Sequence, residues 1–223
     1  MTRRNALLVT LFSLLACGLH STILLTPFNQ YAQTSALKVF LFTLFPVVYF
    51  KVSKEGAIRG LFAAKVDRKG LRLSIILAIS AFAFIFATFM IVNPMLDQSM
   101  IVGALSNVGI TGGNYPLAFA YYTLVNVALE ELFFRGFVFS LLYRMNYRIY
   151  AHVYSSLLFS LYHLSVIRNA AMPGVLFVAI AGLVGVGLLF NELTRRCNSV
   201  AGSYLVHVSA SLAISIVGAY LLY

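Results

Sequence analysis

The chain has 223 residues, of which 61% are hydrophobic and only 10% are charged, and its mean hydropathy is +0.92. In soluble domains about a quarter of the residues are charged, so this composition excludes a water-soluble protein. A net charge of +10 would suit nucleic acid if the basic residues formed a surface patch, but here they fall in short segments between apolar runs. The sequence therefore predicts an integral membrane protein in contact with the lipid bilayer, with no nucleic-acid partner.

Seven apolar runs are long enough to cross a bilayer, which takes about 20 helical residues. In chain order they are 6–26, 36–52, 71–93, 116–143, 151–168, 174–191 and 199–222. Almost nothing is left for a soluble part. The prediction is an all-α, multi-pass membrane helical bundle of about seven transmembrane helices, in which residues 1–223 form a single domain.

The basic residues mark one side of the predicted bundle. If the N-terminus lies inside the cell, the cytoplasmic segments hold 13 of the 16 Lys and Arg residues. The opposite segments hold only Lys38 and Arg168, and Arg135 lies within a span. Because cytoplasmic loops are enriched in Lys and Arg, the sequence predicts the N-terminus inside and the C-terminus outside.

Three segments need separate interpretation. Lys51 to Arg72 mixes basic and apolar residues, which suits either a short helix on the inner leaflet or a solvated basic loop. Residues 94–115, with Pro94 and four glycines, are expected to break the helix as an outer loop or a shallow re-entrant segment. The first apolar run resembles a lipoprotein signal as far as Cys17, but it continues beyond that residue, which favours an uncleaved span.

Only two of the six acidic residues, Glu130 and Glu131, lie deep in a span. A charged side chain at mid-bilayer costs about 2.5–3.5 kcal/mol on insertion scales, so such residues usually serve a function. Glu131 and Arg135 are four residues apart, an arrangement that favours an ion pair on one helix face, either to tether helices or to take part in catalysis. Glu130 points about 100° away and has no basic partner on its own helix face, which indicates a polar cavity.

Two histidines lie at depths that match Glu130. At 1.5 Å per residue, Glu130 lies roughly 20 Å, His163 roughly 18 Å and His207 roughly 12 Å from the inner ends of their spans. His20 is expected to be a core histidine and His152 an incidental interfacial one. A carboxylate and two histidines in a buried cavity can activate water and stabilise an oxyanion, and they are also the ligands of a His₂Glu zinc site.

Other intramembrane protease chemistries lack their motifs in this sequence. It contains no HExxH and no GxSxG, and both aspartates, Asp67 and Asp97, lie outside the spans. Cys17 and Cys197 lie far apart with no metal-binding spacing, and a cysteine transpeptidase has no clear local pattern here. Hydrolysis by glutamate and histidine, with or without a metal, remains the best interpretation.

Three ordered motifs resemble those of the CPBP family, the CaaX proteases and bacteriocin-processing enzymes also called Abi proteins. The family patterns are EExxxR, FxxxH and HxxxN or HxxxD, and the matching segments are Glu130 to Arg135, Phe159 to His163, and His207 with the residues after it. The resemblance covers roughly residues 116–223, the expected catalytic core. A looser match lies at residues 69–72, before the third span.

The resemblance implies an intramembrane endopeptidase that acts on a peptide or a membrane-anchored protein, in the cytoplasmic membrane of a prokaryote. Glu130 and His163 would activate the attacking water, His207 would help to hold the oxyanion, and Glu131 and Arg135 would position the first helix of the site. Members of the family have been described both as metalloproteases and as glutamate proteases. We favour a reaction that requires no cofactor; zinc or another divalent metal on Glu130, His163 and His207 is the alternative.

One position departs from the family pattern. Ser211 stands four residues after His207, where the family has Asn or Asp, and its hydroxyl can donate a hydrogen bond with shorter reach than an amide. This departure leaves open a non-catalytic immunity or peptide-binding membrane protein on the same fold. A proton-coupled transporter would need two related halves, and the sequence shows none.

Overall fold

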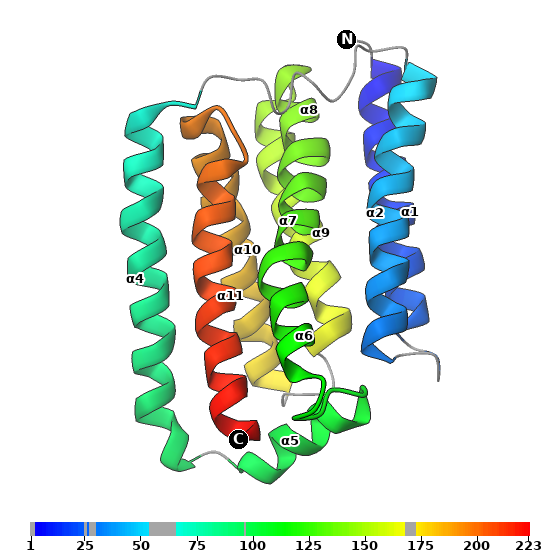
Figure 1. Cartoon of the computed structure of the whole chain (residues 1–223). Helices are drawn as coiled ribbons and strands as arrows, with labels where there is room; N and C mark the ends of the chain where they lie inside the picture. The colour runs from blue at the N-terminus through cyan, green and yellow to red at the C-terminus, as the bar shows by residue number, and fades with distance from the viewer. Residues whose placement is uncertain (1–2, 25, 27–29, 54–65, 96, 168–172) are drawn as a thin grey trace.

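The computed structural model describes residues 3–24, 26, 30–53, 66–95, 97–167 and 173–223. Every regular element in these residues is a helix, and the long helices run side by side as a bundle (Figure 1). A lipid bilayer offers no hydrogen-bond partners, so a spanning backbone must satisfy its own polar groups, which an α-helix does. The predicted all-α membrane bundle is confirmed.

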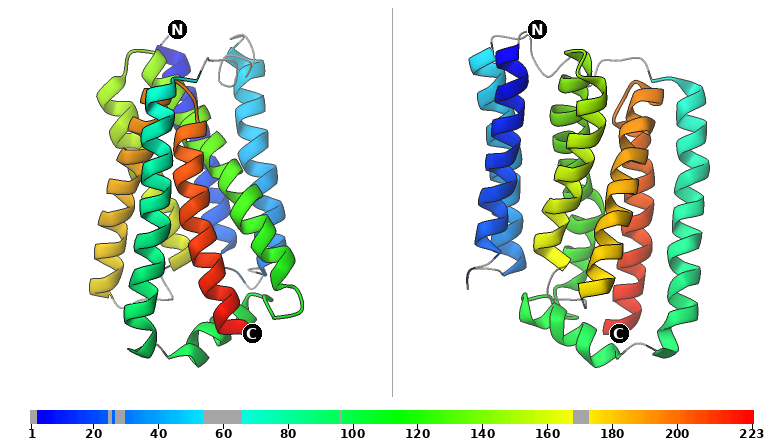
Figure 2. Two further views of the ribbon diagram at one scale, coloured as in Figure 1. Left: turned by 60° about the vertical axis from the view of Figure 1, so that its left-hand side comes forward. Right: turned by 180° about the vertical axis from the view of Figure 1, so that it is seen from behind.

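Five described helices are long and apolar enough to cross a membrane by length and composition. They are α1 (Arg3–Ile23), α2 (Tyr31–Ser53), α4 (Arg68–Val92), Leu176–Cys197 within α10 (Pro173–Cys197), and α11 (Ala201–Leu222). The other two predicted spans are also helical and run beside these five (Figure 2). One of them is α9 (Arg148–Ile167), whose serines and histidines lower its hydropathy.

The fourth span is a continuous helix from Tyr115 to Arg144 that contains two stretches of π-helix. Its parts are α6 (Tyr115–Ala120), η2 (Tyr121–Asn126), α7 (Val127–Glu130), η3 (Glu131–Phe139) and α8 (Ser140–Arg144). The π-helix is rare and occurs mostly as local bulges at functional sites. Here the second stretch begins at Glu131, so Glu130 and Glu131 lie where the helix changes its winding.

The segment between the third and fourth spans is more ordered than expected. It contains α5 (Gln98–Asn107), which lies across the end of the bundle between α4 and α6 (Figure 1). The expectation of an outer loop was therefore wrong for these residues, because one glycine inside a helix costs only about 1 kcal/mol. A shallow re-entrant segment stays a prediction. The chain turns later, at Gly109, whose φ of 82° is one that L side chains rarely adopt. Within the basic segment from Lys51 to Arg72, residues 54–65 lie outside the described part, so a surface helix there stays a prediction.

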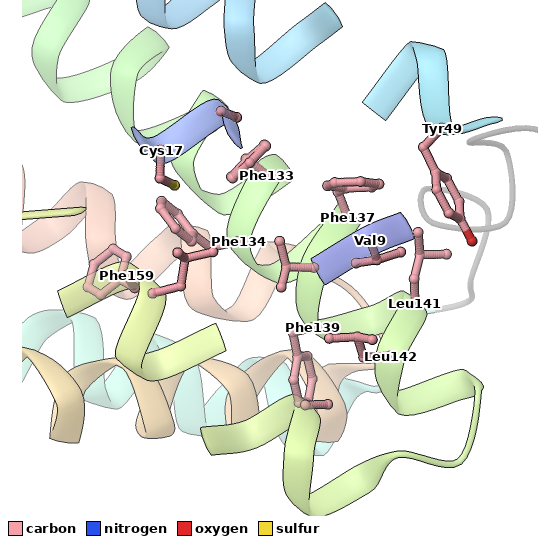
Figure 3. Close-up of a cluster of buried hydrophobic side chains, with 14 of the residues drawn as sticks. Val9, Cys17, Tyr49, Phe133, Phe134, Phe137, Phe139, Leu141, Leu142 and Phe159 are labelled. Atoms are coloured by element: carbon pink, nitrogen blue, oxygen red, sulfur yellow. The ribbon is translucent and has the colours of Figure 1, made fainter. Parts of the chain in front are cut away.

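Aromatic side chains fill the core around the fourth span (Figure 3). Phe42 of α2 stacks on Phe133 with ring centroids 4.0 Å apart, and Phe134 meets Phe159 of α9 edge to face at 5.3 Å. Such pairs contribute about 0.5–1.5 kcal/mol beyond their burial. Cys17 is buried in the same cluster, and α1 continues beyond it to Ile23. These contacts fix α1, α2 and α9 around the helix that carries the two glutamates.

The two ends of the bundle differ in charge. At the end with the N-terminus, basic residues occur at the start of α1, the end of α2, the start of α4, the end of α8, the start of α9 and the end of α10. At the end with α5, the described residues include Asp97 but no Lys or Arg. This asymmetry supports the predicted orientation, with the α5 end outside the cell.

Cysteine labelling in intact cells is expected to report this orientation. The native residues Cys17 and Cys197 are both buried, which keeps the background low. Ser106→Cys, at an exposed position within α5, should react with a membrane-impermeant maleimide in intact cells. Tyr147→Cys, exposed at the basic end, should react only after the membrane is permeabilised. The reverse pattern would contradict the orientation.

Candidate active site

Glu130, His163 and His207 converge from the fourth span, α9 and α11. The Glu130 Oε2 atom lies 3.6 Å from Nε2 of His163 and 3.6 Å from Nε2 of His207. Glu130 is only 3% exposed, and its Oε2 is a buried atom that accepts no hydrogen bond from the described residues. The structure therefore brings together the three residues that the sequence places at similar depths in the membrane.

The hydrogen bonds of the two imidazoles define which ring nitrogen carries a proton. Nδ1 of His163 lies 2.8 Å from the Phe159 carbonyl oxygen, which can only accept, so Nδ1 is the donor. Nδ1 of His207 lies 2.8 Å from Oε1 of Glu131 and donates in the same way. In neutral rings both Nε2 atoms then carry lone pairs that face Glu130 Oε2. Oε2 of Glu130 and Nε2 of His163 are then two acceptors that suit a water molecule, which can donate to both.

Glu131 and Arg135 form the expected ion pair, with Nη1 of Arg135 3.2 Å from Oε1 of Glu131. Arg135 has no solvent exposure, and its guanidinium lies 4.2 Å from the ring centroid of Phe159 and 4.9 Å from that of Phe190. The same Oε1 atom of Glu131 contacts His207. The pair thus tethers helices and also orients one imidazole of the site.

Lys38 belongs to this site, although its place in the sequence did not indicate it. Its Nζ lies 2.5 Å from Oε1 of Glu130 and 2.5 Å from Oδ1 of Asn126, and the side chain is 6% exposed. The assignment of Lys38 to an outer segment was wrong because α2 begins at Tyr31, which carries Lys38 roughly 10 Å into the bundle. Glu130 has no basic partner on its own helix, as the sequence indicated, but α2 supplies one.

A cavity of about 340 Å³ reaches these groups from the α5 end of the bundle. Its lining includes all three convergent side chains and Lys38. Toward the α5 end it is lined by the end of α1 at Leu24, the start of α2 at Tyr31, and Val108 after α5. The site is therefore a polar cavity inside the bundle, as predicted from the lack of a basic partner for Glu130 on its own helix face.

Ser211 lies behind Tyr122, which forms part of the cavity wall. Ser211 is 2% exposed and hydrogen-bonds the Tyr122 side chain. Of these two residues, Tyr122 lines the cavity and Ser211 does not. A tyrosine on the fourth span carries no family motif, so only its depth, two turns before Glu130, could have indicated it.

The other two histidines differ in their relation to the site. His20 is 4% exposed, as expected of a core histidine, but it also lines the cavity, with its ring 5.3 Å from that of Tyr162. His152 lies outside the cavity lining, with its ring 4.8 Å from that of Phe139. His20 is therefore part of the cavity wall, whereas His152 is not.

The metal alternative can be tested against this geometry. Two imidazoles and a carboxylate are suitable zinc ligands, but no three His, Cys, Asp or Glu side chains of the described ranges have the arrangement of a metal site. The positive charges of Lys38 and Arg135 already balance the negative charges of Glu130 and Glu131. A divalent cation would add uncompensated charge to a buried site, which is costly. As arranged, these residues do not fit a metal site.

Comparison with known families agrees with the three motifs. Residues 112–213 match the family model described as "Type II CAAX prenyl endopeptidase Rce1-like". The matched segment includes Glu130, His163, His207 and Ser211 but not Lys38. No curated protein and no solved structure matches the chain significantly. Residues 112–213, just under half of the chain, are therefore similar to the Rce1-like CaaX endopeptidases.

Proposed function

We propose that this protein is an intramembrane endopeptidase that hydrolyses a peptide bond in a peptide or membrane-anchored protein. The observation that carries the proposal is the buried Oε2 of Glu130, faced by Nε2 of His163 and Nε2 of His207. The similarity of residues 112–213 to a family of CaaX endopeptidases supports the reaction class.

Glu130 and His163 activate the attacking water in the proposed reaction. Oε2 of Glu130 takes one proton from the water while His163 Nε2 accepts a hydrogen bond from it. The water oxygen attacks the carbonyl carbon of the scissile bond, and the carbonyl electron pair moves to its oxygen. The C–N bond then breaks, and the proton held by Glu130 passes to the leaving amine.

His207 stabilises the oxyanion in its imidazolium form. Its Nδ1 already donates to Glu131, so Nε2 can donate only when the ring carries a second proton. The Glu131 carboxylate stabilises that cation. Tyr122 lines the same cavity, and its hydroxyl is the second donor, held by its hydrogen bond to Ser211. In this scheme Ser211 acts through Tyr122 rather than on the oxyanion itself.

The substrate enters from the α5 end of the bundle, because the cavity is lined at that end by Leu24, Tyr31 and Val108. In the predicted orientation this is the outer side of the membrane. Thr34 and Ser35 also line the cavity, and their hydroxyl oxygens can accept hydrogen bonds from an extended peptide backbone. A second candidate function, peptide binding without hydrolysis, is favoured only by Ser211 in place of Asn or Asp.

Cleavage of a peptide library by the protein in proteoliposomes tests the proposal. The library should include prenylated C-terminal tails, and mass spectrometry should detect new peptide ends with the wild type. His163→Ala is expected to reduce cleavage by about 10²–10⁴-fold, the usual contribution of acid–base catalysis, while the protein still inserts. An excess of chelator is expected to leave wild-type cleavage unchanged.

His152→Ala is the matched control, because it removes a histidine of the same helix that does not line the cavity. It should cleave as the wild type does. Wild-type cleavage rates in His163→Ala would refute the catalytic proposal. Peptide binding without cleavage by the wild type would favour the second candidate.

A further inference from the structure

Lys38 stands apart from the other lysines that the structure describes. Lys51 and Lys69 are exposed at the basic end of the bundle, whereas Lys38 is buried beside the cavity. An unpaired ammonium group inside an apolar bundle is costly, so a buried lysine requires close partners. Its contacts therefore indicate its role.

The polar contacts of Lys38 are with Glu130 and with Asn126, which itself binds Glu130. The Lys38 ammonium donates to Oε1 of Glu130 and to Oδ1 of Asn126, each at 2.5 Å. The Asn126 amide donates to the same Oε1 at 3.2 Å. The Tyr162 ring centroid lies 5.0 Å from the ammonium, close enough for a cation–π interaction. One oxygen of Glu130 thus has two donors, and the other is left to face the imidazoles.

Two donors on one carboxylate oxygen restrict its rotation. The last torsion of a glutamate side chain is broad, so an unrestrained carboxylate would sample many orientations. With Oε1 held by Lys38 and Asn126, Oε2 points to the Nε2 atoms of His163 and His207. The lysine also provides, from within the protein, a positive charge next to the carboxylate that a metal ion would otherwise provide.

We infer that Lys38 is a positioning residue of the hydrolytic centre, whose ammonium group holds Glu130 in the orientation that activates water and compensates its charge. The inference rests on the proposed function. It extends the site to α2, outside the segment that matches the family, and makes α2 a functional wall of the cavity rather than only a packing helix.

Lys38→Met keeps the length of the side chain and removes the ammonium group. It is expected to lower kcat by about 10²-fold with little change in KM, because the substrate still binds while the base is misplaced. Lys38→Arg, which keeps the charge, should retain more of the activity than Lys38→Met. Lys51→Met, which removes an exposed lysine from the same helix, is the matched control and should behave as the wild type. A wild-type kcat in Lys38→Met would overturn the inference.

A thermal-unfolding cycle in detergent tests the pair without any substrate. Lys38→Met leaves a buried carboxylate unpaired and should lower Tm, and adding Glu130→Gln should restore part of that loss. Additive effects of the two changes would overturn the inference, whatever the activity. A coupled pair with an unchanged kcat would also overturn it. If the effects of the two changes on Tm are coupled but the wild type cleaves no peptide, the ion pair is confirmed. The proposed function is then refuted, and with it the catalytic role of Lys38.

Discussion

Replacing Glu130 by glutamine is expected to slow peptide hydrolysis by about 10²–10⁴-fold, the range in which a general base contributes. The amide keeps the size of the side chain but cannot take a proton from water. It can still accept a hydrogen bond from Lys38, so the surrounding packing should persist. The rate of product formation in proteoliposomes, measured with protein matched for membrane content, gives the effect.

Glu192→Gln is the control for this prediction. Glu192 is a carboxylate at the basic end of α10, where it pairs with Arg195 and Arg196, and it does not line the cavity. Its replacement should leave hydrolysis unchanged. Equal rates for Glu130→Gln and Glu192→Gln would show that Glu130 is not the base.

Replacing Arg135 by methionine is expected to lower the free energy of unfolding by about 3–5 kcal/mol, the usual cost of removing one partner of a buried ion pair. Arg135 has no solvent exposure, so Glu131 would be left as an uncompensated charge inside the bundle. The change should also loosen the orientation of His207, which donates to the same carboxylate oxygen. Unfolding in detergent, followed by circular dichroism, measures the loss.

Two further variants define the cause of that loss. Arg72→Met, which removes an exposed arginine at the basic end, should change stability little. Glu131→Gln combined with Arg135→Met should be more stable than Arg135→Met alone, because no buried charge remains unpaired. If Arg135→Met is as stable as the wild type, the pair contributes nothing to the fold.

Much of the fold follows from the sequence because a bilayer restricts what a chain can do. A spanning segment must be a helix, so each of the seven apolar runs predicts one element, and each run contains a helix. The segment before the fourth span is not under this constraint. There α5 forms despite its glycine, and composition alone could not distinguish it from a loop.

The site was predictable in part. Depth along a helix follows from a rise of about 1.5 Å per residue, so the levels of Glu130, His163 and His207 can be compared by counting residues. Contacts between helices depend on how each helix is rotated about its axis, which spacing within one helix does not reveal. The contact of Glu131 with His207 and that of Lys38 with Glu130 are both of this kind. Tyr122 was missed for the same reason, since its relation to Ser211 crosses from the fourth span to α11.

Hydrolysis in water enriched in heavy oxygen tests the role of Glu130 most directly. A peptide that the wild type cleaves is incubated with the wild type and with Glu130→Gln in proteoliposomes, and mass spectrometry follows the new C-terminal carboxylate. The wild type is expected to incorporate heavy oxygen into that carboxylate, and Glu130→Gln is expected to form the labelled product about 10²–10⁴-fold more slowly. Labelled product formed by Glu130→Gln at the wild-type rate would contradict water activation by Glu130.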